Sequence, residues 1–128
     1  GELIITADTI VIADGAIMGK PHDEAEAAKM LHKLENATHT VVTGVTLMSL
    51  DGAKNDTFSE TTLVTFGPLT DDEITRYVAR YRPLDKAGAY GIQEWIGAAA
   101  IARVDGCFYN VMGLPLHSLY THLKNFYR

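Results

Sequence analysis

Three short segments place charged or amide side chains where a folding element should be apolar, and each could carry chemistry. The first is Ala7-Asp8-Thr9, which lies between 3–5 and 10–12. Both flanking stretches are apolar and rich in β-branched residues, as in a buried strand. A carboxylate in such surroundings is costly unless it has a partner or a function. Asp8 is therefore a candidate for binding or catalysis, although a turn Asp that hydrogen-bonds nearby backbone would leave the same pattern.

The second segment is Gly19-Lys20-Pro21, just before an expected helix start at Asp23. Backbone N–H groups at a helix N-terminus favour anions, and the Lys20 ammonium would add a point charge that suits phosphate. The segment is not a P-loop, because the spacing Gly-x4-Gly-Lys-Ser/Thr is missing. A solvated surface lysine is the alternative interpretation.

The third segment is Asp85-Lys86-Ala87-Gly88-Ala89-Tyr90-Gly91-Ile92-Gln93. Its two glycines let the backbone approach a ligand closely. Lys86 could meet phosphate, and the Gln93 amide offers a donor and an acceptor, as reading a pyrimidine edge requires. An exposed flexible loop is the alternative, but the many small residues beside Trp95 favour a binding loop.

The other reactive side chains form no recognisable constellation. Cys107 is the only cysteine, so an intrachain disulfide is excluded, and its Asp-Gly-Cys-Phe context favours a structural thiol over a nucleophile. His117 and His122 are five residues apart, which places them on different faces of a helix, whereas zinc-binding pairs prefer a spacing of about four. His32 and His39 are separated by the expected end of a helix. A Gly-x-Ser-x-Gly elbow for acyl transfer is also missing.

The composition indicates one globular domain in 128 residues, of which 47% are hydrophobic and 21% charged. A net charge of -5 without a Lys/Arg run argues against a general nucleic-acid binder, while a few placed cations can still hold one triphosphate. No apolar run approaches the roughly 18 residues of a membrane span, and no signal-peptide pattern occurs. Together with the single cysteine, this predicts a cytoplasmic protein without a membrane partner.

Hydrophobic periodicity and capping signals predict the elements that must position these segments. A helix with Asp23 as N-cap and Glu26 at the capping-box position runs to about Leu34. Thr70 and Glu73 open a second helix, and Pro115 opens a last amphipathic one. Strands are expected over 3–5, 10–12, 16–18, 40–50, 58–66 and 98–104. Hairpins that alternate with helices predict an α/β fold with a mixed twisted sheet flanked by helices.

Six segments together resemble the Maf family, the septum-formation inhibitor-like proteins that are also described as house-cleaning nucleotide pyrophosphatases. They occur in family order over nearly the whole chain: 7–11 (Ala-Asp-Thr-Ile-Val), 19–21 (Gly-Lys-Pro), 38–45, 60–66, 85–93 and 110–116 (Asn-Val-Met-Gly-Leu-Pro-Leu). The resemblance implies one Maf-like domain over residues 1–128. It also implies a Maf/ITPase-like architecture with two lobes and a cleft between them.

The resemblance further implies an enzyme, a hydrolase that converts a nucleoside triphosphate to the monophosphate and pyrophosphate with a divalent cation (Mg²⁺, Mn²⁺ or Co²⁺). In such an enzyme Asp8 would be the general base that activates or orients water for attack at the α-phosphate. Lys20 and Lys86 would neutralise charge that develops on the phosphates. The metal ligands within this chain stay unassigned.

Substrate choice also follows from the resemblance. Thr9 and Gln93 match family positions associated with it, and Asp85 and Lys86 open the same binding motif as Gln93. The form Asp-Lys-Ala-Gly-x-Tyr-Gly-Ile-Gln resembles the branch that acts on dTTP and UTP, with CTP and modified pyrimidine nucleotides as further candidates. Glu94 stands where many members have a glycine.

One part of the family pattern is missing. Members begin with a strand and a Ser-x-Ser-Pro-Arg-Arg loop that supplies phosphate contacts, so we expect this chain to be an N-terminally truncated, C-terminal portion of the family domain. The alternative to an enzyme is a non-catalytic nucleotide-binding or regulatory module that lacks this loop. A lost first strand would expose a sheet edge, which predicts low stability or an association that covers the edge, such as a homodimer.

Overall fold

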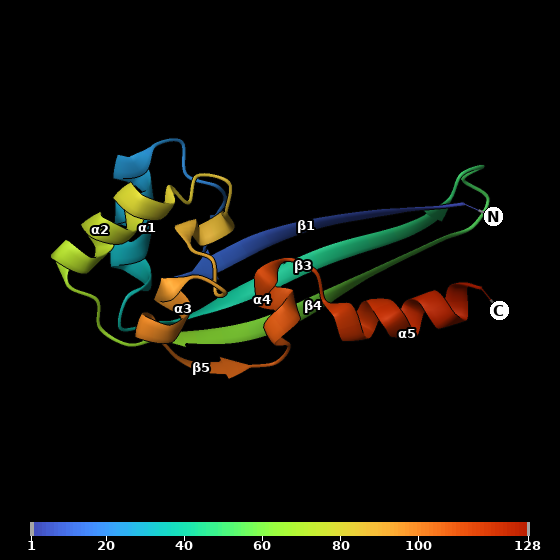
Figure 1. Cartoon of the computed structure of the whole chain (residues 1–128). Coiled ribbons are helices and arrows are strands. Elements are labelled where there is room, and N and C mark those ends of the chain that lie inside the picture. Colours follow the sequence, from blue (N-terminus) through green and yellow to red (C-terminus); the bar gives the residue numbers. More distant parts are fainter. Residues whose placement is uncertain (1, 128) are drawn as a thin grey trace.

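The structure is a computed structural model that describes residues 2–127. Three long strands form the centre of the fold (Figure 1). They are β1 (Leu3–Ala13), β3 (Thr38–Ser49) and β4 (Asn55–Phe66), with short strands β2 (Ala16–Met18) and β5 (Ile101–Asp105) at the two edges. The order in the sheet is β2-β1-β3-β4-β5. With helices packed around this sheet, the expected α/β class is confirmed.

The pairing of the strands differs from the expectation of a mixed sheet. Every pairing in the described part of the chain is antiparallel. Hairpins connect β1 to β2 and β3 to β4, and a hairpin makes its two strands antiparallel. The pairings of β1 with β3 and of β4 with β5 join strands that helices separate along the chain, so their direction is set by the packing of the sheet. The turn between β1 and β2 is the expected Asp14-Gly15, with φ of 54° and 73° at its two residues.

Strand β1 is also longer than expected. The polar residues between 3–5 and 10–12 do not interrupt it, since Asp8 pairs with Gly44 and Thr9 with Thr43 along one continuous ladder with β3. Asp8 is exposed rather than enclosed by apolar neighbours. The expectation that Asp8 is a buried, costly carboxylate was therefore wrong.

The two capped helices lie where the sequence predicts them. In α1 (Glu24–Leu34) the Asp23 side chain accepts a hydrogen bond of 2.8 Å from the backbone N–H of Glu26. In α2 (Asp71–Tyr81) the capping box is complete, because Thr70 and Glu73 each accept from the other's backbone N–H, at 3.1 and 2.9 Å. These bonds satisfy donors that helix starts leave free, and so define where each helix begins.

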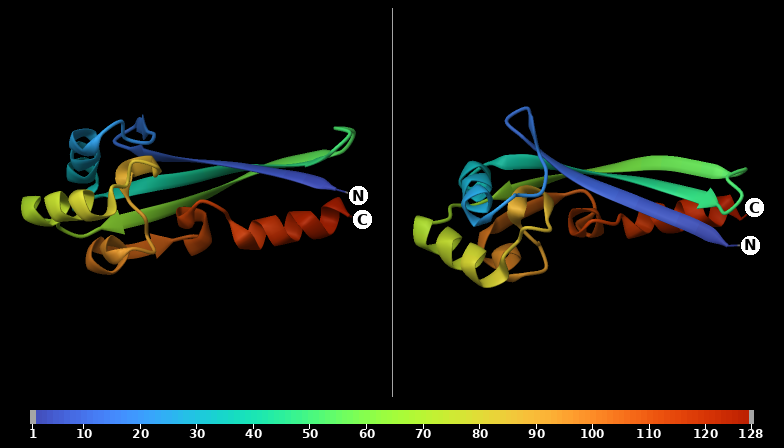
Figure 2. Two further views of the ribbon diagram at one scale, coloured as in Figure 1. Left: turned by 45° about the horizontal axis from the view of Figure 1, so that its top comes forward. Right: turned by 90° about the horizontal axis from the view of Figure 1, so that it is seen from above.

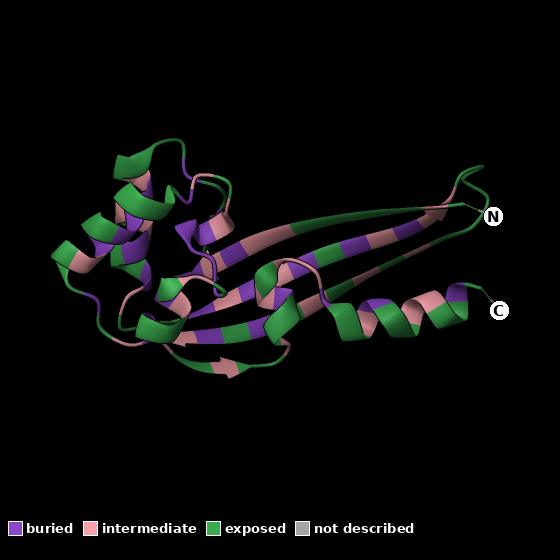
Figure 3. Ribbon diagram, in the orientation of Figure 1, coloured by how far each residue is buried: buried purple, intermediate pink, exposed green. Residues whose placement is uncertain are grey.

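Two separate apolar cores make the fold two-lobed, as expected (Figures 1 and 2). Helices α1 and α2 cover one end of the sheet, where the larger core gathers Leu31, Leu34 and Phe66 with other residues. Helix α5 (Leu116–Phe126) packs along the far halves of the strands, where Leu119 and Phe126 meet Val45 and Leu47. Figure 3 shows that the first half of β1 is largely exposed. None of the described helices has the length and apolar character needed to span a membrane.

The outer edge of β1 is open over most of its length. Strand β2 pairs only with residues 11–13 of β1, so 3–10 have no further strand beside them within residues 2–127. Such an edge leaves backbone donors and acceptors free for another strand. The low stability or association expected from it stays a prediction.

The segment between α2 and α5 contains short elements that the sequence predicted only in part. They are the 3-10 turn η1 (Ala87–Ala89), α3 (Trp95–Ala100), β5 and α4 (Phe108–Met112). The strand expected over 98–104 was wrong at its start, because Ala98–Ala100 end α3. Alanine has the highest intrinsic helix propensity, whereas β-branched Ile101 and Val104 suit a strand.

Candidate active site

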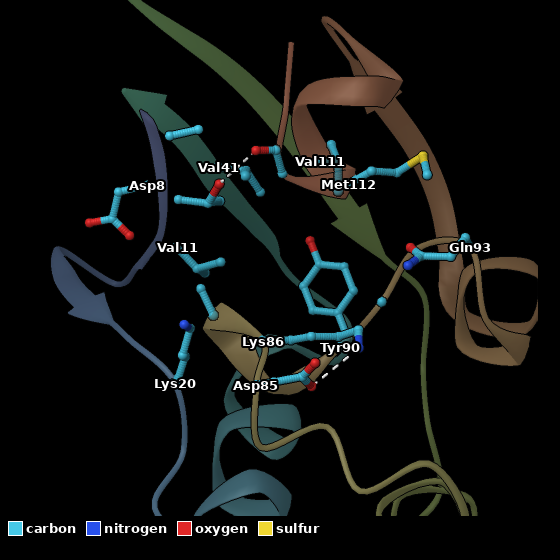
Figure 4. Close-up of a pocket in the computed structure, with 15 residues that line it drawn as sticks. Asp8, Val11, Lys20, Val41, Asp85, Lys86, Tyr90, Gln93, Val111 and Met112 are labelled. Carbon is cyan, nitrogen blue, oxygen red and sulfur yellow. Dashed lines mark hydrogen bonds and ion pairs between the residues drawn. The ribbon is translucent and has the colours of Figure 1, made fainter. Parts of the chain in front are cut away.

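A cavity of about 230 Å³ opens at the side of β1, next to the helical lobe (Figure 4). It collects side chains from β1, from the segment after β2, from the loop around η1 and from the end of α4. All six residues singled out from the sequence line it: Asp8, Thr9, Lys20, Asp85, Lys86 and Gln93. Its volume is below the roughly 300–1,000 Å³ typical of small-molecule pockets, so it would enclose only part of a nucleotide.

Asp8 and Thr9 reach the cavity from opposite sides of the β1 backbone, since consecutive strand residues alternate. Thr9 faces inward: its hydroxyl lies 2.9 Å from that of Thr43 on β3 and 3.5 Å from the carbonyl oxygen of Gly113 after α4. In Figure 4 the Asp8 carboxylate lies on the other side of the strand, away from Tyr90. A molecule that contacts both residues must therefore cross the open edge of β1.

A backbone hydrogen bond joins the Lys20 segment to the Lys86 loop. The N–H of Gly88 donates to the carbonyl oxygen of Gly19 at 3.2 Å. Gly88 has a φ of +72°, and a Cβ there would come within 2.9 Å of a Val11 methyl group, so only glycine fits between the loop and β1. This contact explains how two lysines far apart in the sequence come to line one cavity.

The Lys86 ammonium lies between two carboxylates. It is 3.3 Å from Asp85 Oδ1 and 4.0 Å from Glu94 Oε2, and its side chain is 26% exposed. The hydrogen bond from Lys86 lowers the pKa of Asp85, which keeps this carboxyl ionised. Gln93 is exposed at the cavity wall, where its amide has no hydrogen bond among the described residues and is free to meet a ligand.

Glu94 and Tyr77 form a polar contact that the sequence analysis missed. The Tyr77 hydroxyl donates to Glu94 Oε1 at 2.5 Å and accepts from the backbone N–H of Gly91 at 3.1 Å. Burial, followed by the bond to Glu94, raises the pKa of Tyr77 far above its usual value, so the phenol stays protonated. The sequence assigned Tyr77 only to the apolar stripe of α2, and the departure of Glu94 from the family pattern was the one available signal.

His39 and Tyr90 form a buried pair behind the cavity. His39 Nε2 lies 2.6 Å from the Tyr90 hydroxyl, and both rings pack edge-on against Phe66. Burial lowers the pKa of His39 to about 4 and raises that of Tyr90. Both side chains are thus neutral near pH 7. Tyr90 lines the cavity, and His39 and Phe66 hold its ring in place from behind.

We expect the burial of His39 to make the protein less stable in mild acid. Its pKa falls from 6.5 in the unfolded chain to about 4 in the fold, so the unfolded state takes up a proton first as the pH drops. Above pH 6.5 the neutral His39 contributes its full amount to the free energy of unfolding. Between pH 6.5 and 4 this contribution is lost, which lowers the free energy of unfolding by up to about 3 kcal/mol. Urea denaturation at several pH values measures it. His39→Gln, whose side chain does not titrate, should lose less stability over this interval, and equal losses would contradict the assignment.

Asn110 fixes α4 to the sheet. It is fully buried, and its amide nitrogen lies 3.3 Å from the Val41 carbonyl oxygen, 3.1 Å from that of Glu60 and 3.0 Å from the Thr62 hydroxyl. These contacts reach both β3 and β4. The next three residues, 111–113, line the cavity, so Asn110 sets the position of that wall.

The described residues do not form a preformed cage for a metal ion. They contain no group of three or more His, Cys, Asp or Glu side chains placed to hold one. Mg²⁺ commonly binds through one or two carboxylates together with substrate phosphates. The cavity carboxylates Asp8 and Asp85 fit that second arrangement, in which the cation arrives with the phosphates.

Comparison with known proteins identifies a family over nearly the whole chain. The model of the family described as Maf-like protein matches residues 1–126. A dTTP/UTP pyrophosphatase of Porphyromonas gingivalis is 60% identical over 124 residues, which are 97% of this chain and 61% of the relative. Proteins with the same name from Phocaeicola vulgatus (54%, over 96% of this chain and 63% of the relative) and Carboxydothermus hydrogenoformans (50%, over 95% and 65%) are also similar. The chain thus spans less than two thirds of the length of these relatives.

Proposed function

This chain belongs to the family of Maf-like proteins, and from that membership we propose that its cavity is the catalytic pocket of a nucleoside triphosphate pyrophosphatase that acts on dTTP and UTP. The convergence of the three segments on one cavity is the observation that supports the proposal most directly. Asp8 lies in β1 and Lys20 follows β2 of the same hairpin, whereas Lys86 comes from a loop far along the chain, yet all three line the cavity. Two carboxylates, Asp8 and Asp85, and two ammonium groups around one hollow suit the hydrolysis of a polyphosphate that binds together with a divalent cation.

In the proposed reaction, the oxygen of a water molecule attacks the α-phosphorus of the substrate. The bond between that phosphorus and the oxygen bridging to the β-phosphate breaks, and pyrophosphate leaves with the bonding electrons. Asp8 orients the water and accepts its proton. The carboxylate is suited to this role because it is exposed at the rim of the cavity, where water reaches it.

The lysines act on the phosphates. Lys20 and Lys86 neutralise the negative charge that builds up on the phosphate oxygens and on the leaving pyrophosphate. Because Lys86 is only 26% exposed, its attraction to an anion is less screened by water than that of an open surface lysine. A divalent cation bound to the substrate phosphates near Asp8 and Asp85 would add to this neutralisation.

Base selection is assigned to Gln93 and Thr9. The exposed Gln93 amide can pair with the donor and acceptor edge of a pyrimidine ring. Thr9 is held in place by its hydrogen bond to Thr43, which supports a fixed contact with the substrate. CTP and modified pyrimidine nucleotides share this ring and are proposed as further substrates.

The test is product analysis by chromatography. The chain is incubated separately with dTTP, UTP, CTP, dATP and dGTP in the presence of Mg²⁺, Mn²⁺ or Co²⁺. We expect monophosphate and pyrophosphate from dTTP and UTP, at rates at least about tenfold above those of the purine nucleotides. Lys20→Ala and Lys86→Ala should each slow the reaction, with Lys124→Ala on α5 as the matched control.

Other outcomes would contradict specific parts of the proposal. Release of orthophosphate and a diphosphate would exclude attack at the α-phosphate. Equal rates with purine nucleotides would exclude the pyrimidine preference. Saturable binding of dTTP without any hydrolysis would instead support a non-catalytic nucleotide-binding or regulatory module.

A further inference from the structure

A chain of polar contacts runs from the helical lobe into the cavity. It starts at Tyr77 on α2, continues through Glu94 just before α3, and ends at the Lys86 ammonium. The Glu94 and Lys86 side chains are 20% and 26% exposed, so water screens their contact only in part. The cavity therefore depends on groups behind it as well as on those that line it.

Tyr77 holds one oxygen of the Glu94 carboxylate in place. The phenol is 2% exposed, stacks on Tyr81 with ring centroids 5.0 Å apart, and is anchored by the N–H of Gly91. It remains a donor because its pKa is strongly raised by burial. With Oε1 bound to this rigid hydroxyl, the other carboxylate oxygen of Glu94 is directed toward Lys86.

Gly91 lets Glu94 and Lys86 come together. A Cβ at this position would lie 2.8 Å from Glu94 Oε1 and 2.8 Å from the Lys86 Cε atom. Both side chains therefore pack directly on the Gly91 backbone, which also binds the Tyr77 hydroxyl. This packing limits the positions that the long lysine side chain can adopt.

We infer that Glu94, held by Tyr77, is a positioning residue that presents the Lys86 ammonium to the phosphate groups of the substrate. The inference rests on the proposed function, because it takes a polyphosphate as the ligand. A lysine in water samples many rotamers, and ordering it on binding costs conformational entropy. Glu94 reduces that cost by ordering Lys86 before the substrate arrives. Asp85 makes the shorter contact with Lys86, a hydrogen bond of 3.3 Å, but its side chain is 77% exposed, so water screens that contact more than it screens the contact with Glu94.

The experiment measures binding of inorganic triphosphate by titration calorimetry, which requires no catalysis. Glu94→Gln keeps the size of the side chain and an oxygen for the Tyr77 hydroxyl, but removes the charge that attracts Lys86. We expect it to weaken triphosphate binding about fivefold or more, and to leave it unchanged when Lys86 is already alanine, as in a double-mutant cycle of contacting residues. Tyr77→Phe, which keeps the charge but frees the carboxylate, should weaken binding in the same direction. Glu24→Gln on the exposed start of α1 is the matched control.

Three results would overturn the inference. Tighter binding by Glu94→Gln would mean that this carboxylate only repels the anion. Weaker binding to the same extent with and without Lys86 would mean that Glu94 does not act through the lysine. A parent chain that binds no triphosphate would overturn it as well. Thermal melting of each variant shows whether a loss of folding accounts for a change.

The same variants separate this inference from the proposed function. If dTTP is hydrolysed, Glu94→Gln should lower kcat/KM for dTTP about fivefold, and this loss should disappear when Lys86 is already alanine, because Lys86 contacts the phosphates in the bound substrate and in the transition state. Hydrolysis with an unchanged kcat/KM in Glu94→Gln would contradict the positioning role alone. Triphosphate binding that depends on Glu94 through Lys86, in a chain that hydrolyses no nucleotide, would contradict the proposed function alone.

Discussion

Asp8→Asn is expected to reduce pyrophosphate release from dTTP by a factor of about 100 to 10,000, the usual contribution of a general base. The amide has nearly the shape of the carboxylate but cannot accept the proton of the attacking water. Asp8 is exposed, so its replacement should change the stability of the fold very little. The measurement compares kcat and KM of the two proteins, and kcat should carry most of the loss.

A second carboxylate on the same hairpin provides the control. Asp14 lies in the turn between β1 and β2 with a φ of 54°, a conformation that asparagine also tolerates, and it does not line the cavity. Asp14→Asn should therefore keep its full rate. If the rate of Asp8→Asn lies within a few-fold of the parent rate, Asp8 is not the general base, and another group must activate the water.

Asn110→Ala is expected to lower the unfolding free energy by about 2–4 kcal/mol. The change removes the amide nitrogen near Val41, Glu60 and Thr62 and leaves buried acceptors without their partner. It also creates a void, because Asn110 is fully buried. Chemical denaturation at 25 °C measures the loss.

Asn125→Ala, on the exposed side of α5, is the matched control and should change stability by less than about 0.5 kcal/mol. Asn110→Ala should also raise KM for dTTP in the protein that remains folded, because α4 and its C-cap Gly113 supply residues 111–113 of the cavity wall. A loss below about 1 kcal/mol would show that water replaces the missing amide, and Asn110 would then not fix α4 to the sheet.

Local signals predicted the starts of α1 and α2 well, whereas the short helices α3 and α4 were missed. Capping depends on side chains within four residues of each helix start, so Asp23 and the Thr70–Glu73 box could be recognised directly. The hairpin turn at Asp14-Gly15 is equally local. Strand direction is not, because it depends on which neighbours a strand finds in the sheet. The expected mixed sheet was wrong for this reason.

The candidate site residues came from motifs, and their convergence on one cavity agrees with that choice, while their roles remain proposals. The groups that hold them could not be found in the same way. His39 meets Tyr90, and Tyr77 meets Glu94, only because separate elements pack together. In the sequence, the departure of Glu94 from the family pattern is the one signal for these contacts, and no short spacing pairs His39 with Tyr90 or Tyr77 with Glu94.

The sequence by itself determined the family, the α/β class, the starts of α1 and α2, and which six side chains to look for. All of these depend on residue type and short spacing. Only the tertiary structure decided that Asp8 lies on an open strand edge, that Gly88 ties the Lys86 loop to the Lys20 segment, and that Glu94 reaches Lys86. Solvent exposure, close contact between backbones and partial desolvation depend on which segments surround a residue. They are therefore set only when segments from different parts of the sequence pack together.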